Sequence, residues 1–123
     1  MTHDEVVAME DSELNSMAWT MLYTEKPWKH FADASGTVHI NGADVSIPDY
    51  ANDMSAAWTL VEKLKHPDSV WYATVSLSDH TETYLCSVIY EYAEGSIFQV
   101  WDKSASRAVT CAFIMAMESS YVS

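Results

Sequence analysis

Residues 47–65 read IPDYANDMSAAWTLVEKLK, and they carry the clearest helix signal in the chain. Asn52 or Asp53 stands where an N-cap side chain accepts backbone N–H bonds, and Pro67 ends the helical pattern. Apolar residues recur at three- and four-residue spacing, which is typical of a helix with one buried face. The stripe expected to face inward consists of Met54, Ala57, Leu60 or Val61, and Leu64. The stretch therefore predicts a capped, half-buried helix, and no catalytic motif accompanies it.

The same stretch resembles the phage ABA sandwich domain family of small alpha-beta proteins from phages and prophages. Members carry a Pro-x-Tyr-x-x-Asp-x-x-x-Ala-Trp stretch that opens a helix, matched here by Pro48, Tyr50, Asp53, Ala57 and Trp58. Residues 108–113 also resemble the Ala-rich last helix of the family, although Phe113 replaces the small residue expected there. A weaker match is the first helical segment, residues 13–24. The resemblance implies a fold and a phage context but no reaction, because the family's biochemical role is largely unassigned.

Two patterns predict antiparallel strands. Before the central helix, residues 38–40 and 43–47 flank Asn41-Gly42, a pair that favours a two-residue hairpin turn. After it, residues 71–77, 84–92 and 96–101 alternate between apolar and polar side chains or follow a short turn. These three segments are expected to form an antiparallel meander.

Two further helices are predicted. The first begins at Asp11 or Ser12 and ends before Pro27, with acidic residues in its first turn and an apolar stripe along one face. The second begins near residues 104–106 and runs to about Glu118. Because this last helix is apolar nearly all round, it indicates either deep burial or a partner.

The predicted order of helix, hairpin, helix, three strands and helix indicates the α+β class. At 123 residues the chain is long enough for one hydrophobic core. Residues 1–10 are expected to form a flexible acidic lead, with a turn of helix at residues 6–9 as the alternative, and residues 11–121 a single domain. With the resemblance, the expected architecture is an antiparallel sheet of three to five strands with helices on both faces, an α/β/α sandwich.

Charge restricts the classes of partner. The formal net charge is −12, from 18 acidic and 6 basic residues. Such a chain is poorly suited to binding nucleic-acid phosphates or an anionic membrane surface. Its start lacks the pattern of a signal peptide, no apolar run reaches membrane-spanning length, and Cys86 and Cys111 stand among apolar neighbours. We therefore expect a cytoplasmic protein which, given the resemblance, acts in an infected bacterial host cell.

No arrangement of residues predicts catalysis or metal binding. The five histidines are dispersed and lack the spacing of metal ligands. No glycine-rich phosphate loop is present. Cys111 could pair with a histidine from elsewhere, but its place in mid-helix among apolar residues favours a buried, inert thiol. We expect no enzymatic activity, no metal and no cofactor, and a domain that folds without a disulfide.

The candidate ligand site rests on tryptophans beside cations. Trp28 precedes Lys29, and Trp101 is followed by Lys103 and Arg107, so that two short segments hold most of the few basic residues. Rings and cations next to a helix N-terminus suit a nucleotide-like anion. The alternative is that these loops carry basic residues for solubility. The predicted ligand-binding residues are Trp28, Lys29, Tyr50, Trp101, Lys103 and Arg107.

Two functions stay open. The first is a phage-encoded, non-enzymatic binding protein that sequesters a nucleotide-derived immune signal and so blunts host defence. The second is an acidic interaction module or decoy that inhibits a basic host protein. A homo-oligomer formed through the apolar last helix is expected to complete the ligand site. A small molecule should stabilise the first kind of protein against heat, whereas binding by the second should depend strongly on salt.

Overall fold

The computed structural model describes residues 2–23, 37–40, 43–64, 71–78, 82–90 and 97–118. Over these residues its helices are α1 (His3–Val7), α2 (Asp11–Tyr23), α3 (Met54–Leu64) and α4 (Ala105–Glu118). Its strands are β1 (Thr37–Ile40), β2 (Ala43–Ser46), β3 (Trp71–Ser78), β4 (Thr83–Tyr90) and β5 (Ile97–Asp102). The α+β class and the predicted order of elements are confirmed. None of the described helices is both long and apolar enough to cross a lipid bilayer.

The strands form two separate antiparallel sheets. β1 and β2 pair as the predicted hairpin, with Ile40 opposite Ala43. The predicted meander is a three-stranded sheet in the order β3-β4-β5. In its central row, Val75 lies opposite Cys86, which in turn lies opposite Val100. This register places Cys86 and Val100, both buried, on the face that packs against the helices.

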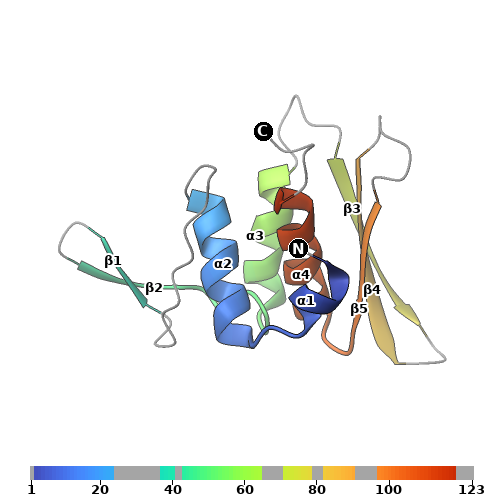
Figure 1. Cartoon of the computed structure of the whole chain (residues 1–123), viewed down its shortest axis with the longest axis horizontal. Coiled ribbons are helices and arrows are strands. Elements are labelled where there is room, and N and C mark those ends of the chain that lie inside the picture. The colour runs from blue at the N-terminus through green and yellow to red at the C-terminus, as the bar shows by residue number, and fades with distance from the viewer. Residues whose placement is uncertain are drawn as a thin grey trace.

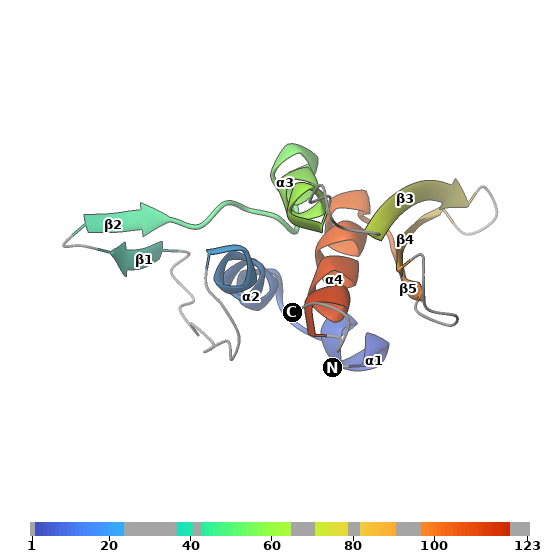
Figure 2. The ribbon, with the colours of Figure 1, turned by 90° about the horizontal axis from the view of Figure 1, so that it is seen from above.

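The helices lie between the two sheets, and the hairpin extends away from them (Figure 1). Seen from above, α1, α2, α3 and α4 all lie on one side of the three-stranded sheet (Figure 2). The expected arrangement of helices on both faces is therefore not found among the described residues. The other face of β3-β4-β5 carries Thr74, Ser76 and Gln99, all exposed, so much of it is polar enough to meet water.

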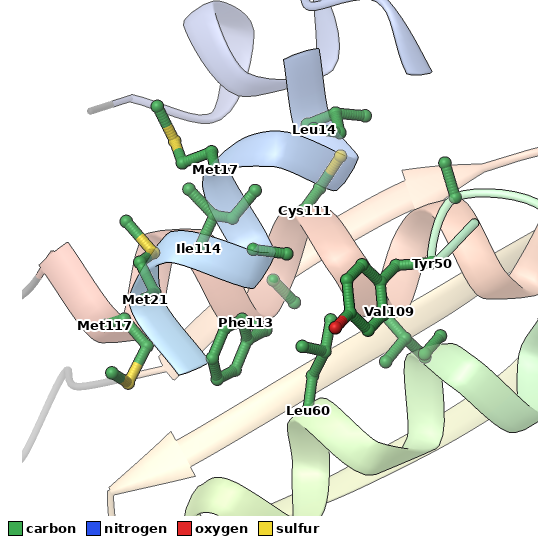
Figure 3. Packing of buried hydrophobic residues seen from close by; sticks show 14 of the residues in the cluster. Leu14, Met17, Met21, Tyr50, Leu60, Val109, Cys111, Phe113, Ile114 and Met117 are labelled. Carbon is green, nitrogen blue, oxygen red and sulfur yellow. The ribbon is translucent and has the colours of Figure 1, made fainter. Parts of the chain in front are cut away.

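Helix α4 is the centre of the core. It contacts α1, α2, α3, β4 and β5, and nearly every residue from Ser106 to Met117 is buried. Figure 3 shows side chains of α2, α3 and α4 meeting around Phe113 and Ile114. Of the two explanations for this apolar helix, deep burial accounts for its composition within one copy of the chain. Little of its apolar surface is left for a partner.

Residues 2–10 differ from the expected flexible lead because they contain a helix. Thr2 and Glu5 form a capping box, in which each side chain accepts the other residue's backbone N–H, both at 3.2 Å. Val6 is 0% exposed, and α1 contacts α4 and β5. The Thr2-x-x-Glu5 spacing was a usable local signal for this helix, whereas the burial of Val6 depends on elements from the other end of the chain.

The central helix α3 has the predicted cap. The Asp53 Oδ1 atom accepts the backbone N–H of Ser55 at 3.0 Å and that of Ala56 at 3.4 Å. Ala57, Leu60 and Val61 are buried as expected. Met54 is instead exposed, because it occupies the first helical position, at the rim of the core.

Candidate functional site

Tyr50 lies in the core and not on an open surface. Its side chain is 1% exposed and lies beside Leu60 of α3 and Val109 of α4 (Figure 3). Burial is the main reason that the pKa of its phenol rises to about 12, and the nearby Tyr23 adds to this effect. The tyrosine of the family-like motif therefore packs the turn onto the helices, and it is not accessible to a ligand in solvent.

The polar residues around Tyr50 fix the same turn to α2. The Asn15 amide donates to Asp49 Oδ1 at 2.9 Å, and its oxygen accepts the Ala51 N–H at 2.9 Å. The Asn52 amide donates to Asp49 Oδ1 at 3.1 Å and to Asp11 Oδ2 at 3.1 Å. The motif thus holds the entry to α3 in place and has a structural role.

Arg107 also binds within the protein. Its Nη2 atom donates to the carbonyl of Val7 at 2.9 Å and to that of Met9 at 2.6 Å. Its Nη1 donates to Asp11 Oδ1 at 2.5 Å, and its Nε lies 3.2 Å from Asp102 Oδ2. We name this arrangement of five residues the Arg107 clamp. Because its donors face protein acceptors, Arg107 is placed to join α1, α2 and β5 and not to receive an external phosphate.

The N-terminus of α4, which was expected to favour an anion, is capped internally. Ser104 Oγ accepts the Arg107 backbone N–H at 3.3 Å, and Asp102 Oδ1 accepts that of Ser104 at 2.9 Å. The Ser106 hydroxyl donates to the Ala51 carbonyl at 2.9 Å. The first two bonds satisfy backbone N–H groups that an anion would otherwise use.

Trp101 and Lys103 are the predicted site residues that reach solvent. Trp101 is 50% exposed, lies opposite Leu85 of β4 and projects from the sheet face that no described helix covers. Lys103 follows on the turn into α4 and is also exposed. Trp28 and Lys29 lie outside the described residues. Trp101 and Lys103 thus both lie exposed at the end of β5, whereas Tyr50 is buried in the core.

Sequence reasoning missed the residues that surround Trp101. Leu85, partly exposed, is its cross-strand neighbour, and Gln99 lies two residues before it on the same face. The Gln99 amide donates to the Ser87 hydroxyl at 3.4 Å, so a polar pair lies on the same face of the sheet. The alternation of β4 and β5 was a usable signal, since residues of the same parity as Trp101 share its face.

The model of the phage ABA sandwich domain matches residues 15–114 of this chain. The chain belongs to the phage ABA sandwich domain family. The match includes the 48–58 motif, Trp101, Lys103 and Arg107, whereas α1 precedes it. The family description names a fold and a phage origin but no activity.

A solved structure supports the same fold for this phage ABA sandwich protein. This chain is similar to a phage protein from Bacillus cereus ATCC 14579, whose crystal structure was solved at 2.0 Å, and the two superpose with a TM-score of 0.66. The two share 18% identity, over 88% of this chain and 92% of that one. At this identity the likeness establishes the fold alone. No curated protein matches the chain.

Groups that could support catalysis are scarce in the part of this phage ABA sandwich protein that the structure describes. Cys86 and Cys111 are free and buried, and burial raises the pKa of each thiol to about 12. Protonated, inaccessible thiols make poor nucleophiles. Within the same residues, no three His, Cys, Asp or Glu side chains gather as metal ligands.

Proposed function

We propose that this phage protein is a non-enzymatic binding protein that sequesters a nucleotide-derived host immune signal, and so acts against host defence in the infected cell. The observation that supports this function is the exposed Trp101 two residues before the exposed Lys103. An indole with half of its surface in water retains apolar area that a stacked base can cover.

The chemistry of these two residues suits one small, aromatic anion. Trp101 offers a ring face for a nucleobase, and Lys103 offers a point charge for a phosphate. A net charge of −12 disfavours a long polyanion, because many phosphates would approach many carboxylates. A single nucleotide carries few negative charges, and its phosphate can approach Lys103 without approaching many carboxylates.

A thermal-shift screen tests the proposal. The wild-type protein is melted alone and with AMP, NAD, cyclic AMP or cyclic di-AMP. Binding of at least one nucleotide raises the melting temperature, because a ligand at 100 times its Kd stabilises the folded state by about 2.7 kcal/mol. Trp101→Ala loses this rise. Tyr23→Ala, which removes an exposed aromatic ring on α2, keeps it. No rise with any nucleotide, or an equal rise in Trp101→Ala, contradicts the proposal.

An acidic decoy is the second candidate function, and the sorting of charge in the fold favours it. β3, β4 and β5 contain one charged residue, Asp102, which pairs with Arg107. By contrast, Asp4, Glu5, Glu10 and Glu13 are all exposed at the start of the chain. A basic host protein that binds this region should dissociate as salt is raised. The double variant Glu10→Lys, Glu13→Lys should abolish binding of the basic protein and leave any nucleotide response intact. If the double variant instead keeps the protein binding and loses the nucleotide response, the ligand-binding function is favoured.

A further inference from the structure

The two edges of the three-stranded sheet differ. β5 lies at one edge and is contacted by α1, and Val100 on it is fully buried. β3 lies at the other edge, and no described strand pairs with its outer side. Val75 belongs to the same cross-strand row as Val100 and faces the helices too, yet it stays partly exposed. α3 contacts β3 as α1 contacts β5, so among the described residues the two edges differ in the partial exposure of Val75 against the burial of Val100.

β3 also lacks the features that usually protect an open edge. Its eight residues, Trp71–Ser78, include no charged residue and no proline. All eight pair with β4 in one unbroken register, so no bulge bends the strand away. Leu77, near its end, is 55% exposed. Natural edge strands are normally shortened, charged, bulged or covered, because their free N–H and C=O groups accept another strand.

We propose that the outer edge of β3 pairs antiparallel with β3 of a second copy of this chain, so that two three-stranded sheets become one six-stranded sheet. The same surface serves on both copies, which is the closed two-fold arrangement of most homodimers. Because residues opposite each other in an antiparallel pair share a face, the helices of both copies lie on the same side of the joined sheet.

The distribution of charge favours a second copy of this chain, and not a different protein, as the partner of the β3 edge. Two chains of −12 repel wherever their acidic helical sides approach. The sheet is the exception, because its three strands carry one charged residue, Asp102, which turns inward to Arg107. Within β3 itself, neither copy presents a carboxylate to the other. A basic partner would instead be attracted to the exposed acids of α1 and α2.

The same reasoning sets the expected strength of the dimer. A strand-edge contact lies at the small end of specific interfaces, below about 1,200 Å² in total, so the dimer should be reversible and depend on concentration. Salt should strengthen it, because screening removes the remaining repulsion between two acidic chains. This association does not depend on the proposed nucleotide ligand.

Sedimentation analysis over a dilution series, at low and high salt, tests the proposal. Wild-type protein should show a monomer–dimer equilibrium that shifts toward dimer in high salt. Thr74→Lys should weaken dimerisation about tenfold or more, because two-fold pairing brings the like charges of the two copies close together on one face. Gln99→Lys is the matched control. It lies in the same cross-strand row, is exposed like Thr74 and changes the net charge equally, but it lies on β5.

Circular dichroism melting confirms that each variant is folded, and Ser76→Lys replaces Thr74→Lys if that variant does not fold. Hydrogen exchange gives an independent readout: β3 amides of the wild type should gain protection with concentration, while β5 amides do not. A wild type that stays monomeric throughout overturns the proposal. Equal weakening by Thr74→Lys and Gln99→Lys also overturns it, because the sheet face and not the β3 edge would then form the contact. A dimer that neither variant affects assigns the interface to another surface.

Discussion

Arg107 on α4 forms an ion pair with Asp11 in the first turn of α2, across a sequence separation of 96 residues. The same guanidinium lies 3.2 Å from Asp102, at the end of β5. Only 17% of the Arg107 side chain is exposed, so these contacts are partly shielded from water. The Arg107 clamp thus fastens the first two helices to the C-terminal part of the fold.

Replacing Arg107 by Ala should destabilise the protein by roughly 2–4 kcal/mol. The change leaves the Asp102 carboxylate and two backbone carbonyls without their donor, and the cost stays below that of a fully buried pair because Asp11 is about half exposed. Urea unfolding measures the loss. Lys103→Ala is the control, since removal of this exposed cation should change the free energy of unfolding by no more than about 0.5 kcal/mol. If Arg107→Ala and Lys103→Ala lower the free energy of unfolding by the same small amount, the Arg107 clamp does not stabilise the fold.

Asp53→Ala should cost about 0.5–2 kcal/mol, because α3 loses the carboxylate that accepts its first backbone N–H groups. Asp53→Asn and Asp53→Ser keep an oxygen acceptor and should recover most of the loss. Thermal melting of the three variants measures the difference. If Asp53→Ala keeps full stability but abolishes ligand binding, the residue is a binding group and its assignment as a cap fails.

Local patterns predicted most of the elements of this fold. The Asn41-Gly42 pair located the hairpin, alternation located β3 and β4, and the spacing around Asp53 located α3. Each of these signals needs only neighbouring residues. The uncovered face of the sheet was not predicted, because it depends on which distant elements pack together. The start of α1 was overlooked, although its Thr2-x-x-Glu5 capping box is a local signal.

Local patterns do not reveal contacts with distant residues, and this limit also explains why Arg107 and Tyr50 were predicted as site residues. Trp101 was identified because an aromatic residue beside a cation is visible in the sequence, and the structure leaves it exposed. Arg107 looked equally suitable, but three of its four acceptors come from residues about a hundred positions earlier. Tyr50 belonged to a recognisable motif whose spacing does not reveal that the ring is buried. Composition and spacing indicate which residues can bind a ligand, whereas tertiary contacts decide which remain accessible.

Alkaline pH should destabilise the fold from about pH 9 upward. Burial raises the pKa of Cys86 and Cys111 from 9.0 to about 12, so between these values the unfolded chain loses thiol protons that the folded chain keeps. The free energy of unfolding then falls by about 1.4 kcal/mol per pH unit for each thiol. Tyr50 adds to the fall above pH 10. Urea unfolding at pH 8 and pH 10 measures the slope, which should be smaller in the double variant Cys86→Ala, Cys111→Ala. If the slope in that variant equals the slope of the wild type, the loss of stability at alkaline pH does not come from the two thiols.

A chelator and a reductant together should leave the melting temperature unchanged. Both cysteines are free, and their burial in the core requires no bond between them. A fall of more than a few degrees, reversed by adding a metal ion or by removing the reductant, would show that the fold depends on a metal or a disulfide after all.

Calorimetric titration of the nucleotide that gives the largest thermal shift, into wild type and Trp101→Ala, tests most directly whether this phage protein binds its ligand through the exposed indole. Loss of base stacking should weaken binding by about 1–3 kcal/mol, roughly 5- to 150-fold in Kd, while Tyr23→Ala binds as the wild type does. Equal affinity of wild type and Trp101→Ala, or no measurable heat with any nucleotide in the panel, would contradict the account.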